Sequence, residues 1–120
     1  MSTEPQTIEA QLGVLRRSFE TVIATAHCSA EGFLLSFDGE PGFDESILGD
    51  IVASASTLSS DVGTIVGKVS PTVMVSSAQG AIAMRQLTDG TWVSIVVSDG
   101  AALGRAAFEL AELEEPSKTS

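Results

Sequence analysis

His27 and Cys28 are the side chains of this sequence best suited to bind a metal or to act in nucleophilic catalysis, and they are its only histidine and only cysteine. A closed zinc site takes about four ligands, so this pair would need carboxylates or a second subunit to complete it. Catalysis by a serine would need His27 as its base, and the chain lacks a Gly-x-Ser-x-Gly elbow. The simpler interpretation is a small buried cysteine at the end of an element. We therefore expect no metal site and no catalytic activity.

A phosphate-binding loop is suggested at first sight by residues 63–70, which read GTIVGKVS. Only three residues separate Gly63 from Gly67, whereas the phosphate-binding motif has about four, and Val69 stands where that motif needs Ser or Thr. The stretch also ends a predicted helix, whereas phosphate groups bind where a helix begins. We expect neither a nucleotide site nor any other cofactor.

The net charge of the chain limits the classes of partner that it is expected to bind. Asp and Glu number 16 against 6 Lys and Arg, which gives a formal net charge of −10. Because the basic residues are few and scattered, binding to nucleic acid or to an anionic membrane surface is not expected. A partner with a basic surface is favoured. The absence of a secretory signal, of a long apolar run and of a second cysteine leads us to expect a cytoplasmic protein without membrane insertion.

Hydrophobic periodicity and turn residues predict one domain over residues 1–120, with loose ends at 1–5 and 115–120. Thr3 and Gln6 form a possible capping box for the first helix, and Asp44 and Gly67 bound the second. The predicted elements are a helix over 6–27, a strand over 32–37, a short strand over 40–43, a helix over 45–66, strands over 72–77, 81–87 and 91–98, and a helix over 101–114.

This order predicts an α+β fold, an α/β sandwich of the profilin-like type. A single five-stranded antiparallel sheet would carry helices on both faces, because tight turns join the last three strands and each helix has an apolar stripe. In the second helix that stripe consists of Ile47, Ile51, Leu58, Val62 and Ile65.

Two features point to a paired surface. The second helix has a run of small residues, among them Ala55, Ser56 and Ser59, which would let another backbone approach closely. The strand 72–77 carries no charge, whereas an edge strand usually needs protection from pairing. We interpret this strand as either interior to the sheet or made to pair with another chain.

The pattern from about residue 8 to residue 113 resembles the Roadblock / dynein light chain family. The resemblance is carried by the segment 31–41, EGFLLSFDGEP, by the small-residue helix 47–66, and by the three strands that end at Asp99 and Gly100. The loop 40–43 is richer in Gly, Pro and Phe than the family pattern.

The resemblance implies a homodimer, or a heterodimer with a homologous Roadblock subunit, in which strand 72–77 pairs with its mate and the two second helices lie side by side. It also implies binding and regulation of a small Ras-like GTPase, as a scaffold or as an activator of hydrolysis. The composition fits the actinobacterial members, whose operons include a sensor kinase and a GTPase. The implied dimer interface consists of Thr72, Val73, Met74, Val75, Ser76, Ala55, Ser56 and Ser59. The implied GTPase-binding surface consists of Leu48, Ile51, Val52 and Ala55.

A second hypothesis is a ligand-binding sensory domain of the profilin-like or PAS-like type, because the same general plan serves such domains. A sensor needs a pocket between sheet and helix with a few polar groups. The residues offered there are mostly Val, Ile and Ala, which favour a closed core.

Overall fold

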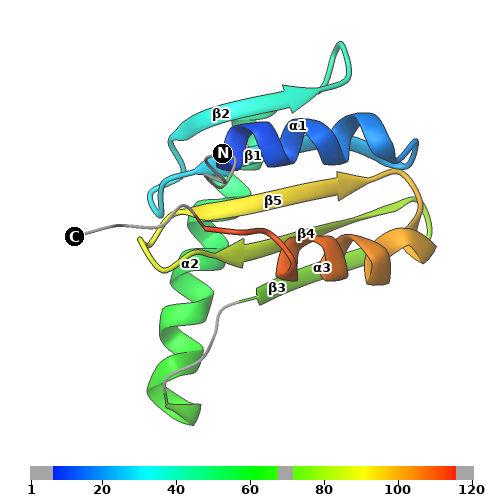
Figure 1. Cartoon of the computed structure of the whole chain (residues 1–120). Helices are drawn as coiled ribbons and strands as arrows, with labels where there is room; N and C mark the ends of the chain where they lie inside the picture. The colour runs from blue at the N-terminus through cyan, green and yellow to red at the C-terminus, as the bar shows by residue number, and fades with distance from the viewer. Residues whose placement is uncertain (1–6, 68–71, 116–120) are drawn as a thin grey trace.

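Residues 7–67 and 72–115 are described in the structure of this protein, a computed structural model (Figure 1). Their elements follow the predicted order of helix, two strands, helix, three strands and helix. In chain order they are α1 (Ile8–Ser18), β1 (Val22–Cys28), β2 (Leu34–Gly39), α2 (Glu45–Val66), β3 (Thr72–Ser77), β4 (Gly80–Gln86), β5 (Trp92–Val97), a short 3-10 turn η1 (Gly100–Ala102) and α3 (Leu103–Ala111).

The strands form one five-stranded sheet in the order β2-β1-β5-β4-β3, and all neighbours are antiparallel. Helices α1 and α3 cover one face and α2 crosses the other (Figure 1). The expected fold class is thereby confirmed. Strands β2 and β3 are the two edges, so the uncharged strand 72–77 is an edge strand.

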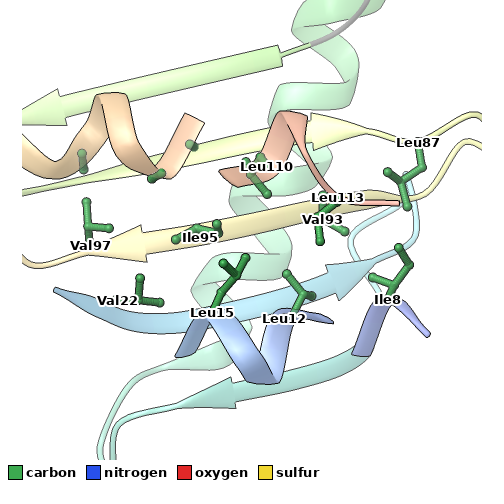
Figure 2. Close-up of a cluster of buried hydrophobic side chains, with 13 residues drawn as sticks. Ile8, Leu12, Leu15, Val22, Leu87, Val93, Ile95, Val97, Leu110 and Leu113 are labelled. Carbon is green, nitrogen blue, oxygen red and sulfur yellow. The ribbon is translucent and has the colours of Figure 1, made fainter. Parts of the chain in front are cut away.

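Each face of the sheet has its own core. Between the sheet and α1 and α3, aliphatic side chains interlock in the cluster of Figure 2, which includes Ile8, Leu12, Leu15, Val22, Leu87, Val93, Ile95, Val97, Leu110 and Leu113. Between α2 and the sheet lies a second cluster, to which both contribute: Ala26, Cys28, Leu48, Val52, Ala55, Met84 and Trp92. Trp92 is fully buried in this second cluster.

The predicted helix 6–27 is wrong in its second half. Helix α1 ends at Ser18, and Phe19 takes an extended conformation with φ −128° and ψ 119°. The residues that follow form β1, which pairs with both β2 and β5. The apolar residues of this segment fit a helical spacing as well as an alternating one, and β-branched residues such as Val22, Ile23 and Thr25 favour the strand. The helix is capped by the Thr7 side chain, which accepts a hydrogen bond from the Ala10 N–H. Thr3 and Gln6 lie outside the described residues.

The predicted strands at 32–37 and 40–43 are corrected too. The strand runs over Leu34–Gly39, so Asp38 and Gly39 belong to β2, and residues 40–43 form a loop. Near its start the register with β1 shifts by one residue: Leu34 opposes Cys28 and Ser36 opposes His27, which leaves Leu35 as a bulge. The missed β1 and the absent strand 40–43 offset each other, so the element order and strand count still hold.

The remaining elements are close to their predictions. Helix α2 covers 45–66 as expected, with the Asp44 side chain accepting from the Ser46 N–H and Gly67 ending the helix at φ +83°. The three strands of the meander match within a residue or two. The last helix is shorter than 101–114, because η1 precedes it and Glu112 ends it.

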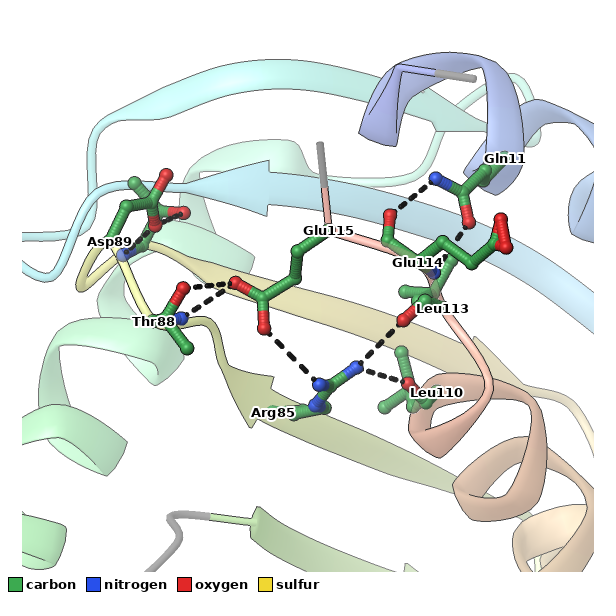
Figure 3. Close-up of polar contacts among 9 residues, drawn as sticks. Gln11, Arg85, Thr88, Asp89, Leu110, Leu113, Glu114 and Glu115 are labelled. Atoms are coloured by element: carbon green, nitrogen blue, oxygen red, sulfur yellow. Dashed lines mark hydrogen bonds and ion pairs between the residues drawn. The ribbon is translucent and has the colours of Figure 1, made fainter. Parts of the chain in front are cut away.

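The segment after α3 is fastened to the rest of the fold by polar contacts (Figure 3). Gln11 donates to the Glu114 carbonyl at 2.7 Å and accepts from the Glu114 N–H at 2.9 Å. Arg85 donates to the Leu110 carbonyl at 2.8 Å. The Glu115 carboxylate accepts from the N–H and the hydroxyl of Thr88 at 2.8 and 2.7 Å, and Arg85 lies 3.4 Å away. Hydrogen bonds from Thr88, with a smaller contribution from Arg85, lower the pKa of Glu115.

Replacing Glu115 with glutamine is expected to lower the free energy of unfolding by about 1 kcal/mol at pH 7, because the charge-assisted bonds to Thr88 and Arg85 are weakened. Since the folded-state pKa of Glu115 is lowered, its stabilisation is present above the unfolded pKa and is lost as the pH falls through the folded value. Urea unfolding from pH 7 to pH 3 should therefore show the two proteins converging at acid pH. Glu114→Gln removes the same charge from an exposed side chain and should leave stability nearly unchanged; an equal loss would contradict the role of Glu115.

Candidate protein-binding surface

The two halves of α2 have different surroundings. In the first half, Leu48, Gly49, Val52 and Ala55 are buried against the sheet. No residue of the second half, 56–66, is fully buried. Figure 1 shows the reason: α2 continues past the edge strand β3, so its C-terminal half has no part of this sheet beneath it.

An apolar stripe runs along the exposed side of α2. It consists of Ile47, Ile51, Leu58, Val62 and Ile65, and all five side chains are exposed, Leu58 by 53% and Ile65 by 84%. These residues share one helical face next to the buried one. Exposed apolar surface that extends over several turns of a helix is typical of an interaction site in a soluble protein.

A groove lies between this stripe and the β3–β4 hairpin, with a volume of about 420 Å³. Its helical wall is formed by Ile47 and Ile51, and Val75, Ile82 and Val96 lie on the sheet side. Its lining is mostly apolar, with the serines and Gln79 of the hairpin at one end. The groove therefore offers an apolar surface to a helix or strand from outside this chain.

The β3 edge adds backbone groups to the same region. One side of β3 pairs with β4, and among the described residues no strand lies on the other side. Met74 and Val75 point to opposite faces of the sheet and are 50% and 59% exposed. An open edge with exposed apolar side chains and no charge is suited to pairing with another strand.

The predicted interface residues of β3 lie at this edge, and Val73 alone is partly covered. Ser56 and Ser59 are half-buried on α2. Ala55 lies on the side of α2 that packs on the sheet and is buried within the single chain, so it does not reach an exposed interface as predicted. The predicted GTPase-binding surface needs the same correction: Leu48, Val52 and Ala55 are core residues, and of the four only Ile51 reaches the surface.

The residues that the sequence interpretation missed as a surface are Ile47, Leu58, Val62 and Ile65. Their signal was present, because their spacing is the clearest apolar periodicity of the helix. By itself, such a periodicity predicts the face that packs on the sheet. The sheet instead contacts the neighbouring face, whose Gly49 and Ala55 contribute little to an apolar pattern.

The side of α2 that faces away from the sheet is polar and acidic. Asp50, Ser54, Thr57 and Asp61 are exposed there, and the helix contains no Lys, Arg or His. With Glu45 in its first turn, α2 carries only negative charges. A partner that docks on this face would be favoured by basic side chains.

His27 and Cys28 have different surroundings: Cys28 is buried in the cluster between α2 and the sheet, whereas the His27 ring bonds Thr91. The Thr91 hydroxyl lies 2.6 Å from the Asp89 carboxylate, which can only accept, so the 2.8 Å bond between His27 Nε2 and Thr91 is donated by the imidazole. Burial lowers the pKa of His27, an effect that Asp89 opposes, and burial raises the pKa of Cys28 to about 11. Within residues 7–67 and 72–115, no three His, Cys, Asp or Glu side chains gather as a metal site, and no helix is long and apolar enough to span a bilayer.

No protein-family profile and no curated protein sequence matches the chain. Solved structures do match. A Roadblock/LC7 domain from Streptomyces avermitilis superposes with a TM-score of 0.65 at 21% identity, over 90% of this chain and 92% of that one. A structure of MglB with a tetrameric arrangement gives 0.70 at 12% identity, over 94% and 90% of the two chains. MglC from Myxococcus xanthus gives 0.56 at 17% identity, over 88% and 92%. The chain therefore has the fold of the Roadblock/LC7 domain.

Proposed function

We propose that this protein is a dimeric, non-catalytic module of the cytoplasm that binds and regulates a small Ras-like GTPase. The observation that carries the proposal is the exposed apolar stripe of α2 beside the open edge of β3. The Roadblock/LC7 fold supports the role, because the family resemblance of the sequence implies GTPase binding. One of the similar structures is of MglB with a tetrameric arrangement, which supports an assembly of several chains.

The proposed dimer follows from the complementarity between the β3 edge and α2 of one copy and the same elements of a second copy. If the β3 edges of two copies pair about a two-fold axis, the two sheets become continuous and the overhanging half of each α2 lies over the partner's sheet. Leu58, Val62 and Ile65 then lie near the apolar groove of the partner, beside its Ile47 and Ile51. Each copy supplies both the protruding half-helix and the groove, as an isologous interface requires.

The surface left for the GTPase is the outward face of the two α2 helices, where Asp50, Ser54, Thr57 and Asp61 are exposed. In the dimer, Asp50 and Asp61 of one α2 would lie beside those of the other, and α2 has no basic residue to offset their negative charge. Basic residues on the partner would speed association and make it sensitive to salt. Specificity would come from the small serine and threonine side chains, which allow close approach.

Calorimetry tests this assignment. Titration of GTP into the isolated protein should give no heat of binding, because the proposal places the nucleotide on the partner. A Ras-like GTPase isolated with the protein from its native cell, loaded with a GTP analogue, should bind. Asp61→Lys should raise the dissociation constant about tenfold, or about 1.4 kcal/mol, while the protein stays dimeric.

The matched control is Glu112→Lys, a charge reversal at an exposed residue that follows α3 on the opposite face of the sheet. It should leave GTPase binding unchanged. Equal weakening by both variants would show that only the net charge matters and would reject the α2 face as the docking surface.

A ligand-binding sensor is the second candidate, and one observation favours it. A hollow of about 670 Å³ lies between α1 and β2, with Glu9, Arg17 and Asp38 at its rim and Thr25 in its lining. Its mixed charges would suit a polar small molecule. Thermal stabilisation by members of a metabolite library, lost in Arg17→Ala, would support the sensor, whereas the GTPase module predicts no such stabilisation.

A further inference from the structure

We infer that two copies of the chain pair their β3 strands in one particular register, in which Met74 lies directly opposite the partner subunit's Met74. This inference rests on the proposed function, since it takes the β3-edge dimer as its starting point. It goes further by stating which residues oppose one another along the seam.

The first step is the assignment of faces within β3. Val73 opposes Met84 and Val75 opposes Ile82, and both of these β4 residues pack in the core beneath α2. Met74 opposes Ala83, which belongs to the core beneath α1 and α3. Directly opposed residues of an antiparallel pair point to the same face. Val73 and Val75 therefore face α2, whereas Thr72, Met74 and Ser76 face the side of α3.

The second step is symmetry. When two identical edge strands pair in the antiparallel sense about a two-fold axis, that axis must stand perpendicular to the sheet. An axis in the sheet along the strands would make the two strands parallel. An axis in the sheet across the strands would reverse the strand direction without placing the two copies side by side. A perpendicular axis keeps each face of one copy on the same side as in its partner. A residue on the α2 side can then oppose only a partner residue on the α2 side, which excludes every register that places Met74 opposite the partner's Val75.

The third step is the chemistry of the three central registers that remain. Centring on Met74 places Val73 opposite the partner's Val75, twice by symmetry, and Thr72 opposite the partner's Ser76. Centring on Val75 instead places Met74 opposite the partner's Ser76 and Val73 opposite the partner's Ser77. Centring on Val73 leaves Val75 and Ser76 opposite residues outside β3.

Only the Met74-centred register pairs each apolar residue of β3 with an apolar one and Thr72 with a serine, and it leaves Ser77 alone opposite a residue outside β3. Cross-strand pairs of like kind are the ones that stabilise a sheet. It also gathers the four valines on the α2 face, where the overhanging helices would cover them. The two Met74 side chains meet on the opposite face, and each is half exposed in the single chain.

Disulfide formation by single cysteine variants tests directly which β3 residues oppose one another across the dimer. Opposed Cα atoms of an antiparallel pair are about 4.5–5.5 Å apart, inside the range of about 4.4–6.8 Å that a disulfide spans. Diagonal neighbours are about 7–8 Å apart and fall outside it. Met74→Cys is expected to form a covalent dimer of twice 12.4 kDa under a mild oxidant on a non-reducing gel. Native Cys28 is buried with a pKa of about 11, so the unmodified protein should stay uncrosslinked.

Val73→Cys and Val75→Cys should each remain uncrosslinked alone, and an equimolar mixture of the two should form the covalent dimer. Crosslinking of Val75→Cys or Val73→Cys alone would overturn the register while leaving the β3-edge dimer intact. Failure of every variant in a protein that light scattering shows to be dimeric would overturn β3 as the seam. A protein that is monomeric by light scattering would overturn the dimer of the proposed function as well. Circular dichroism confirms folding of each variant.

Discussion

Leu58→Glu is expected to convert the protein from a dimer into a folded monomer. Leu58 is half exposed in the single chain and lies on the half of α2 that extends past β3, so the fold does not depend on it. In the proposed dimer the side chain is covered by the partner's apolar groove. A carboxylate there would be buried without a partner charge, and symmetry would place the penalty at two sites. The dissociation constant should rise at least about a hundredfold, or about 3 kcal/mol.

Light scattering at micromolar concentration should give twice 12.4 kDa for the unmodified protein and 12.4 kDa for Leu58→Glu, with unchanged helical circular dichroism. The control is Thr57→Glu, which introduces the same charge at the adjacent exposed residue on the outward face of α2. That variant should remain dimeric. A dimeric Leu58→Glu, or dissociation of both variants, would contradict the assignment of the apolar stripe to the interface.

Gly49→Ala is expected to destabilise the fold strongly, although alanine is the better helix former. A Cβ atom at Gly49 would lie well inside contact distance of the carbonyl oxygen of Gly32. The obstacle is backbone in a tight turn, with Gly32 itself at φ +95°, so it cannot move aside like a side chain. Overpacking of this kind costs about 3 kcal/mol, and the gain in helix propensity of about 1 kcal/mol offsets only part of it.

The expected net loss is about 2 kcal/mol, which should lower the melting temperature by roughly 8 °C. Gly104→Ala provides the control, because it lies in α3 with no atom within 4 Å of the added Cβ. It should raise the melting temperature slightly, by roughly 2 °C, since it removes freedom from the unfolded chain. If both variants changed the melting temperature in the same direction, the effect of Gly49→Ala could not be attributed to the contact between α2 and the turn that contains Gly32.

The sequence by itself determined the bounds of α2 and the positions of the last three strands, whereas the predicted order of elements matches only because the missed β1 and the absent strand 40–43 offset each other. Helix α2 was bounded correctly because Asp44 and Gly67 are local signals that act within one turn. The strands β3 to β5 were found because short turns separate segments rich in β-branched residues. The exclusion of phosphate-binding and serine-nucleophile motifs also needed only residue types and spacing.

The end of α1 was decided by tertiary structure. The segment 22–28 has apolar residues that satisfy both periodicities, and the strand preference of its β-branched residues is too weak to separate helix from strand by itself. Its conformation is fixed by pairing on both sides, with β2 and β5, which are distant from each other in sequence. A central strand of this kind is recognised only when both neighbours are in place.

The candidate site was decided in the same way. The sequence contains the stripe of Ile47, Ile51, Leu58, Val62 and Ile65, and periodicity alone assigns it to the core. Helix α2 packs on the sheet through the adjacent face, because Gly49 lies against the Gly32 turn and the small Ala55 is buried between the helix and the sheet. The most apolar side of the helix is thereby left exposed next to the open edge of β3. Which of two neighbouring faces packs inward depends on backbone close approach between distant segments, and a hydrophobic pattern does not contain that information.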